Sequence, residues 1–270
     1  MSLQSTQAVL PGKKLLNAAA IFWFVTALIG QWIFVAYLVL LYGVSAMRGD
    51  LEVWSTKISH GYVPGDLVGN LAVAAHLLLA VIIMLAGPLQ LIPQVRARLP
   101  VFHRWNGRIY LVAVLLTSIA GLYMLWVHGT VGGLILALGQ SLDAFLIIVF
   151  GIFALRAALA RDFATHRRWA LRLFMVVSAV WFFRVGLMLW LLIHQAPVGF
   201  NPDTFEGPFV NFIVLAQYLI PLAVLELYFR AQASEHGNLK VAMAILLVCL
   251  TLAMAVGIFG AFMGLWLPNL

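Results

Sequence analysis

The chain has 270 residues, of which 64% are hydrophobic and only 9% are charged, with a mean hydropathy of +1.04. A soluble domain cannot bury so much apolar surface, so this composition excludes a soluble globular protein and indicates an integral membrane protein. The net charge of +7 does not indicate a nucleic-acid partner, because the basic residues lie where membrane topology requires them. The single cysteine, Cys249, excludes both a disulfide framework and a cysteine-based metal site.

Seven apolar stretches are long enough to cross a bilayer as helices, which takes about 20 residues each. In chain order they lie near residues 16–43, 69–94, 101–127, 134–158, 169–194, 210–230 and 241–267. The first stretch is too long for the apolar part of a signal peptide, so we expect it to be retained as the first helix. No linker divides the chain, and residues 1–270 are predicted to form a single polytopic membrane domain.

Basic residues set the expected orientation of these helices. If the N-terminus and the connections after the second, fourth and sixth helices lie inside, 13 of the 16 Lys and Arg residues are cytoplasmic, and only Arg48, Lys57 and Arg184 are not. The positive-inside rule therefore predicts a cytoplasmic N-terminus and an external C-terminus.

Two segments of the chain share one pattern. Each has a histidine and an arginine shortly before a tryptophan, an arginine three residues after it, and the tripeptide Met-Leu-Trp at its end. The opening tryptophans, Trp105 and Trp169, are 64 positions apart. The pattern predicts an internal repeat over about 69–128 and 134–194, in which the second to fifth helices form a duplicated four-helix core. Alternatively, the tryptophans of each segment, about 31 Å apart along a helix, mark two aromatic belts.

Five of the seven histidines lie at or inside the ends of the expected helices. His103 and His166 lie at the cytoplasmic starts of the third and fifth helices, and His128 and His194 at the outer ends of the same helices. Two tiers of histidines suit a transmembrane haem protein, because a low-spin haem takes two axial imidazoles from facing helices. We therefore expect His76, His103 and His166 to be ligands of haem iron. Solvated histidines at the membrane interface are the alternative.

His76 differs from the others because it lies about two turns inside a membrane helix. An unsatisfied polar group there costs several kcal/mol, so the imidazole needs an internal partner. If His76 binds haem, its second axial ligand is expected from the outer half of another helix, which nominates His128 or His194. His76 also belongs to an expected polar layer in the outer half, together with Gln31, Gln140, Asp143, Arg184 and Gln217.

Charged side chains inside the expected helices need partners, because a lone charge in a bilayer is costly. Asp143 and Arg184 both lie about 14 Å from the outer ends of their helices, so we expect a buried ion pair between them. Its role is either to fix the pairing of two helices or to hold an anionic group, with Arg184 bound to a haem propionate or a substrate carboxylate. Glu226 is expected to pair with Arg230, four residues along the same helix.

Arginines and aromatic rings also gather at the cytoplasmic ends of the repeated helices. Such a cluster suits anionic lipid headgroups or an anionic ligand, while ordinary topology signals give the same composition. The arginines concerned are Arg104, Arg108, Arg167, Arg168 and Arg172.

Three short motifs follow one another along the chain. They are Gly87-Pro88-Leu89-Gln90, then His103-Arg104-Trp105 with Gly107, Arg108 and Tyr110, then His166-Arg167-Arg168-Trp169 with Arg172, followed by Arg184. Over about 70–190 this order and spacing resembles the bacterial membrane proteins of domain-of-unknown-function family 2306, with Ala170 where that family is expected to have a methionine. The resemblance implies a multi-pass protein of the bacterial cytoplasmic (inner) membrane and marks the motifs as the family's signature. It implies no activity.

The sequence leaves three functional hypotheses. We expect a b-type haem protein that transfers electrons across or into the membrane and exchanges them with quinone. A looser likeness to di-haem cytochromes of the b561 type is an analogy, since it rests only on four core helices with histidines near both faces. One alternative is a small-molecule or proton-coupled transport or binding protein that uses His76, Asp143 and Arg184. The other is a haem-free accessory subunit, whose partners are the lipid bilayer and other membrane subunits.

Overall fold

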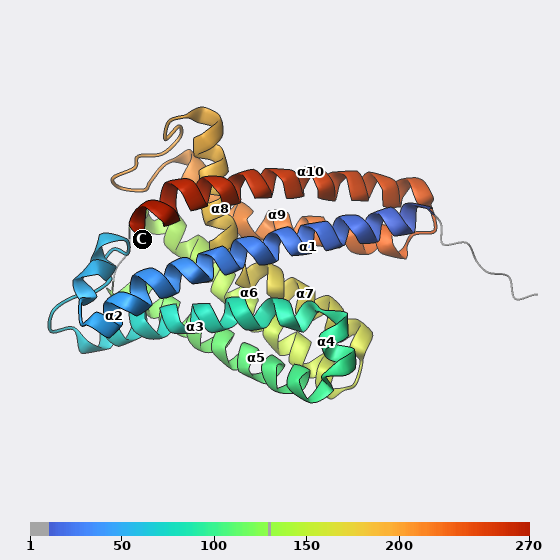
Figure 1. The fold of residues 1–270 in the computed structure, drawn as a ribbon, viewed down its shortest axis with the longest axis horizontal. Coiled ribbons are helices and arrows are strands. Elements are labelled where there is room, and N and C mark those ends of the chain that lie inside the picture. Colours follow the sequence, from blue (N-terminus) through green and yellow to red (C-terminus); the bar gives the residue numbers. More distant parts are fainter. Residues whose placement is uncertain (1–10, 129–130) are drawn as a thin grey trace, which may run out of the picture.

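The chain folds into a bundle of long helices that run side by side (Figure 1). The computed structural model describes residues 11–128 and 131–270. Among these residues there is no β-strand, and six helices are long and apolar enough to cross a membrane. A bent pair of helices gives a seventh span if its two halves cross together. The expected all-α membrane fold is therefore confirmed, while the side of the membrane on which the N-terminus lies stays a prediction.

Each expected span corresponds to one helix or to one helix pair. In chain order the spans are α1 (Pro11–Leu38), α3 (Leu67–Leu91), α5 (Pro100–Tyr123), α6 (Gly133–Leu159), the pair α7 (Phe163–Val177) and α8 (Ala179–His194), α9 (Pro208–Ala233) and α10 (Gly237–Ala261). Shorter elements extend or join them, namely η1 (Val39–Gly43), α2 (Val44–Arg48), η2 (Leu51–Thr56), α4 (Pro93–Arg98), η3 (Met124–His128), η4 (Phe262–Trp266) and η5 (Leu267–Asn269). Prolines begin α4 and α5, because a first-turn residue has no helical N–H bond to lose.

The fifth span departs from the continuous helix expected over 169–194. It begins earlier, at Phe163, and bends by 51° at Ser178, between α7 and α8. The backbone N–H of Trp181 donates to the carbonyl oxygen of Ser178, so a new helix starts there. Gln31 of α1 donates through Nε2 to Ser178 Oγ over 3.1 Å, and both side chains are buried. The break is thus held by a polar contact inside the bundle, which the apolar pattern of the sequence does not reveal.

Helix pairs build the bundle. α3 packs along α5, α6 along α7, and α1 along α10, and α1 lies between α10 and α3 (Figure 1). Small residues permit the closest approaches: a Cβ on Gly257 of α10 would lie 2.5 Å from the carbonyl oxygen of Val185 on α8. The first two pairs are those that the internal repeat predicts. The duplication itself stays a prediction.

One end of the bundle carries α4, the start of α1 and the connection between α9 and α10 (Figure 1). We call it the basic end, because most Lys and Arg residues lie there. At this end Arg172 Nε of α7 donates to Glu226 Oε1 of α9 over 2.7 Å. Glu226 therefore does not pair with Arg230 as expected. The guanidinium of Arg172 on α7 is its partner instead. The ring of Trp169, whose centroid lies 4.6 Å away, holds that guanidinium in position.

Asp162 caps the start of α7. Its Oδ1 accepts a hydrogen bond from the backbone N–H of Thr165 over 3.1 Å. The hydrogen bonds from Thr165 and from the backbone N–H of Ala164 hold the pKa of the Asp162 carboxyl below its usual value. The charged carboxylate favours the helix N-terminus, so the second His-Arg-Trp motif lies on the first turns of a capped helix.

A double-mutant cycle tests the contact between α7 and α9. We expect Arg172→Gln and Glu226→Gln each to lower the midpoint of unfolding in detergent, with a coupling free energy of about 1 kcal/mol, because the pair is only partly buried. The matched cycle on Glu226 and Arg230 should give no coupling. Equal coupling in the two cycles would contradict the cross-helix pair.

Candidate functional site

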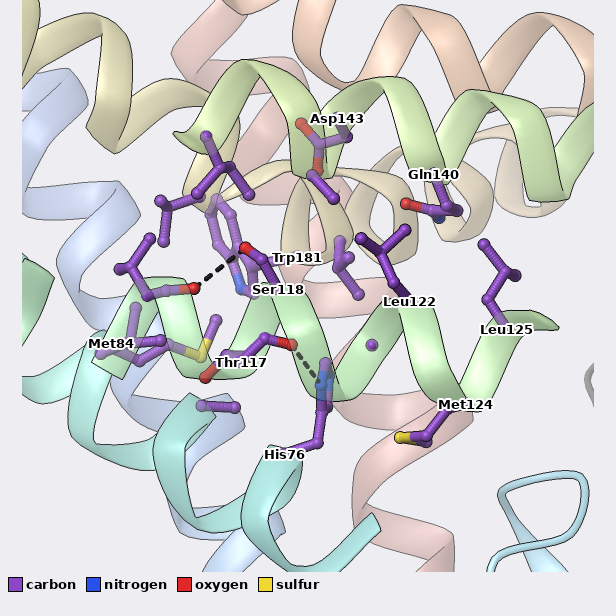
Figure 2. Close-up of a pocket in the computed structure, with 18 of the residues that line it drawn as sticks. His76, Met84, Thr117, Ser118, Leu122, Met124, Leu125, Gln140, Asp143 and Trp181 are labelled. Carbon is purple, nitrogen blue, oxygen red and sulfur yellow. Dashed lines mark hydrogen bonds between the residues drawn. The ribbon is translucent and has the colours of Figure 1, made fainter. Parts of the chain in front are cut away.

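A cavity of about 310 Å³ lies inside the bundle, in the half away from the basic end. We call it the inner cavity. Side chains from α1, α3, α5, α6 and α8 line it, and Figure 2 shows many of them as sticks. Most of the lining is aliphatic or aromatic, and its polar members come from α3, α5, α6, α8 and the segment after η2. They are Ser59, His76, Thr117, Ser118, Gln140, Asp143 and Trp181.

His76 of α3 points across the helix pair towards α5 (Figure 2). Its Nδ1 lies 3.2 Å from the carbonyl oxygen of Thr117, and a carbonyl oxygen only accepts, so Nδ1 carries the proton. Nε2 of the neutral ring is then an acceptor that remains for a ligand. The ring fits because α5 has a glycine beside it: a Cβ on Gly121 would lie 3.3 Å from His76 Cε1.

Three polar atoms of the inner cavity are buried and have no hydrogen-bond partner among the described residues. They are Thr117 Oγ1 of α5, Asp143 Oδ1 of α6 and Trp181 Nε1 of α8. Each atom lacks the hydrogen bond that a buried polar group normally makes, which costs about 1–3 kcal/mol of folding free energy. All three residues line the same cavity, together with His76. The cavity therefore has the polar groups of a binding site.

Asp143 and Arg184 do not form the expected buried ion pair. The carboxylate of Asp143 is only 4% exposed and has no salt bridge among the described residues. Arg184 donates through Nη1 to the carbonyl oxygen of Val180 over 3.1 Å, and its guanidinium lies 5.2 Å from the ring centroid of Phe34 on α1. The guanidinium is thus directed to its own helix and to the ring of Phe34, and no carboxylate of the described residues contacts it.

The expected polar layer is only partly assembled. His76, Gln140 and Asp143 come together around the inner cavity, whereas Arg184 and the two other glutamines are not among its lining residues. Gln31 binds Ser178 at the helix break. Gln217 Nε2 donates to the carbonyl oxygen of Val214 on its own helix over 2.8 Å, and its Oε1 is buried without a partner.

The predicted haem ligands do not come together around one space. His103 and His166 lie at the basic end, near enough to interact electrostatically, and neither lines the inner cavity. His166 Nδ1 donates to the carbonyl oxygen of Ala154 over 2.9 Å, whereas His103 Nδ1 is buried and unpartnered in the described structure. At the far end, the Nδ1 of His194 lies 3.0 Å from the carbonyl oxygen of Trp190. The side chain of His128 lies outside the described residues.

No three His, Cys, Asp or Glu residues within 11–128 and 131–270 gather closely enough to hold a metal ion. A bis-imidazole haem at the inner cavity needs a second histidine, and His76 is the one histidine of its lining. Among the described lining residues no second histidine accompanies His76, and the side chain of His128 lies outside the described residues, so a haem at this place stays a prediction.

Arginines at the basic end stack on aromatic rings. Arg108 lies 4.9 Å from the ring centroid of Trp105, and Arg168 lies 4.8 Å from that of Phe229. Arg167 Nη1 donates to Gln232 Oε1 over 3.3 Å. The five arginines of the sequence motifs thus belong to the starts of α5 and α7, where Arg108 stacks within its own helix and the three arginines of α7 contact α9.

Thr117 and Trp181 are site residues that the sequence did not nominate. Nothing in the sequence distinguishes Thr117 from other hydroxyl residues of membrane helices, which usually bond to their own backbone. Trp181 has the position of an ordinary core tryptophan. Only the bend at Ser178 and the rotation of α5 bring their polar atoms to the inner cavity.

Comparison with known proteins gives a family and nothing finer. The model of a family described as "Predicted membrane protein (DUF2306)" matches residues 73–229. This range contains α5, α6, α7 and α8 entirely and all of the α3 residues that line the inner cavity. No curated protein and no solved structure matches the chain.

Asp143→Asn tests whether the carboxyl group serves stability or binding. The carboxylate has no partner to lose among the described residues, and a neutral amide is cheaper to bury, so we expect the free energy of unfolding to rise by about 1 kcal/mol. Glu226→Gln is the matched control and should lower stability, because it breaks a formed ion pair. Destabilisation by Asp143→Asn would show that the carboxyl group has a structural partner.

Proposed function

The chain belongs to the DUF2306 family of predicted membrane proteins, and for this member we propose a membrane-embedded binding protein for a small lipid-soluble molecule with a polar head group. One observation carries the proposal: three unpartnered polar atoms from three helices, together with the imidazole of His76, line a single cavity inside the bundle. Natural proteins retain such uncompensated groups where function requires them.

The polar atoms define what a head group must offer. Trp181 Nε1 only donates, so the ligand needs an acceptor there. His76 Nε2 accepts, and the Thr117 hydroxyl does both. Asp143 accepts when charged and donates when protonated. Ring carbonyls and hydroxyls supply these groups, as in a quinone and its quinol.

The apolar lining and the volume restrict the rest of the ligand. Methionines and aliphatic side chains surround the polar groups, among them Met84, Leu122 and Met124 (Figure 2). A volume of about 310 Å³ lies at the lower end of the range of small-molecule sites. A single ring with a short chain fits these limits better than a macrocycle does.

Transport is a second candidate, and the broken span favours it. Val177, Val180 and Trp181 line the cavity on both sides of the bend at Ser178. Discontinuous helices next to a membrane-embedded site are typical of secondary transporters, in which part of a helix moves around bound substrate. Binding comes first in either case, so the same experiment tests both.

A short-chain quinone, decylubiquinone, is the probe for the head-group contacts. We expect it to raise the unfolding midpoint of the purified protein in detergent, because ligand binding stabilises the folded state. Trp181→Phe removes the N–H donor together with part of the indole ring and should weaken the apparent affinity about tenfold. Trp32→Phe, on the exposed face of α1, is the matched control and should leave the shift unchanged.

Decylbenzene, which has the chain but no polar head, should give no specific shift. Equal shifts with the two probes, or loss of the shift in Trp32→Phe as well, would mean that the polar atoms of the cavity do not recognise the ligand. The dithionite-reduced spectrum provides a separate check: an α-band near ~560 nm that disappears in His76→Ala would replace this proposal with a haem protein.

A further inference from the structure

A second hollow lies on the outer surface of the bundle, between α3 and α5, with a volume of about 320 Å³. Leu79 and Ile82 of α3 form one wall, and five residues of α5 between Trp105 and Ala113 form the other. We call it the lipid-facing groove. The lipid-facing groove shares no lining residue with the inner cavity.

The groove faces outward and is almost wholly apolar apart from one arginine. Trp105, Ile109 and Val112 of α5 are all more than half exposed. From Trp105 to Ala113 the helix rises about 12 Å, which is close to the depth of one bilayer leaflet. The groove therefore runs from the basic end towards the middle of the membrane, as one acyl chain does.

Arg108 places an uncompensated positive charge at the part of this groove nearest the basic end. Its guanidinium lies 4.9 Å from the ring centroid of Trp105, which covers one face and leaves the N–H edges open. Arg104 lies one turn before it, and the sequence has no Asp or Glu between Leu67 and Leu142. No salt bridge of either arginine occurs among the described residues.

The second copy of the motif shows what a neutralised arginine of this kind looks like. Arg172 stacks on Trp169 as Arg108 stacks on Trp105. Arg172 also bonds to Glu226 of α9 and lies 5.5 Å from the ring centroid of Phe229. In the first copy no helix of the described residues supplies these groups, which leaves the same arginine for an anion from the membrane.

We propose that the lipid-facing groove binds one anionic phospholipid, with its phosphate on Arg108 and an acyl chain along Ile109 and Val112. Charge complementarity selects the headgroup, because guanidinium edges bind phosphate oxygens in a bidentate manner. The apolar walls hold the chain. This site is independent of the proposed ligand of the inner cavity.

Native mass spectrometry of the full chain tests the proposal, with phosphatidylglycerol and phosphatidylcholine of identical chains as probes. We expect phosphatidylglycerol to bind in preference, and Arg108→Gln to weaken its binding about fivefold to tenfold. Arg98→Gln, at the same end of the bundle but outside the groove, is the matched control and should change binding little. Val112→Trp should fill the groove and weaken both lipids.

Three results would overturn the proposal. One is equal binding of the two lipids by the unaltered chain. Another is an equal loss in Arg98→Gln and Arg108→Gln, which would indicate diffuse charge. The third is unchanged binding of phosphatidylglycerol by Val112→Trp, or the detection of a second copy of the chain bound in place of lipid. If Arg108→Gln does not fold, Arg108→Lys, which keeps the charge but loses the planar edges, should show intermediate affinity.

Discussion

A polar group inside a bilayer finds its partner within the protein or remains uncompensated at a cost of several kcal/mol. Most polar side chains in this bundle have a hydrogen-bond partner within the protein. Thr251 Oγ1 donates to the carbonyl oxygen of Leu247, and Gln31 Nε2 donates to Ser178 Oγ. Arg184 Nη1 donates to the carbonyl oxygen of Val180 on its own helix. Seven buried polar atoms of the described residues have no partner, and three of them, on Thr117, Asp143 and Trp181, line the same cavity.

The bend at Ser178 connects this polar cavity to the packing of the bundle. Before the bend, on the side of the basic end, α7 is attached to α9 through Arg172 and Glu226. After the bend, α8 packs closely on α10 at Gly257. α9 contacts both halves of the span and α10 packs along α8, while Trp181 lies just after the bend and lines the cavity. A change in the angle between the halves would move the Trp181 donor relative to Asp143, so occupancy of the cavity and helix geometry are linked.

Hydropathy and charge placement predicted the membrane spans, because burial in lipid is a property of a whole segment. Depth along a helix was enough to nominate His76 and Asp143 as buried polar residues. The partners of charged residues were harder to predict. The predicted Asp143–Arg184 and Glu226–Arg230 ion pairs are not formed, because helix rotation and neighbouring aromatic rings determine where each arginine points. Arg184 contacts the ring of Phe34. Arg172, which stacks on Trp169, forms the ion pair with Glu226 in place of Arg230.

The His-Arg-Trp motifs show how one sequence pattern acquires two physical roles. Both motifs stack an arginine on a tryptophan one turn away, which fixes the guanidinium at the start of a membrane helix. In the second motif α9 covers the pair and supplies Glu226, so the arginine joins two helices of the protein. In the first motif the pair lies at the lipid-facing surface beside an apolar groove, so its charge remains for the membrane. The difference arises from the neighbouring helix, because the local sequences are alike.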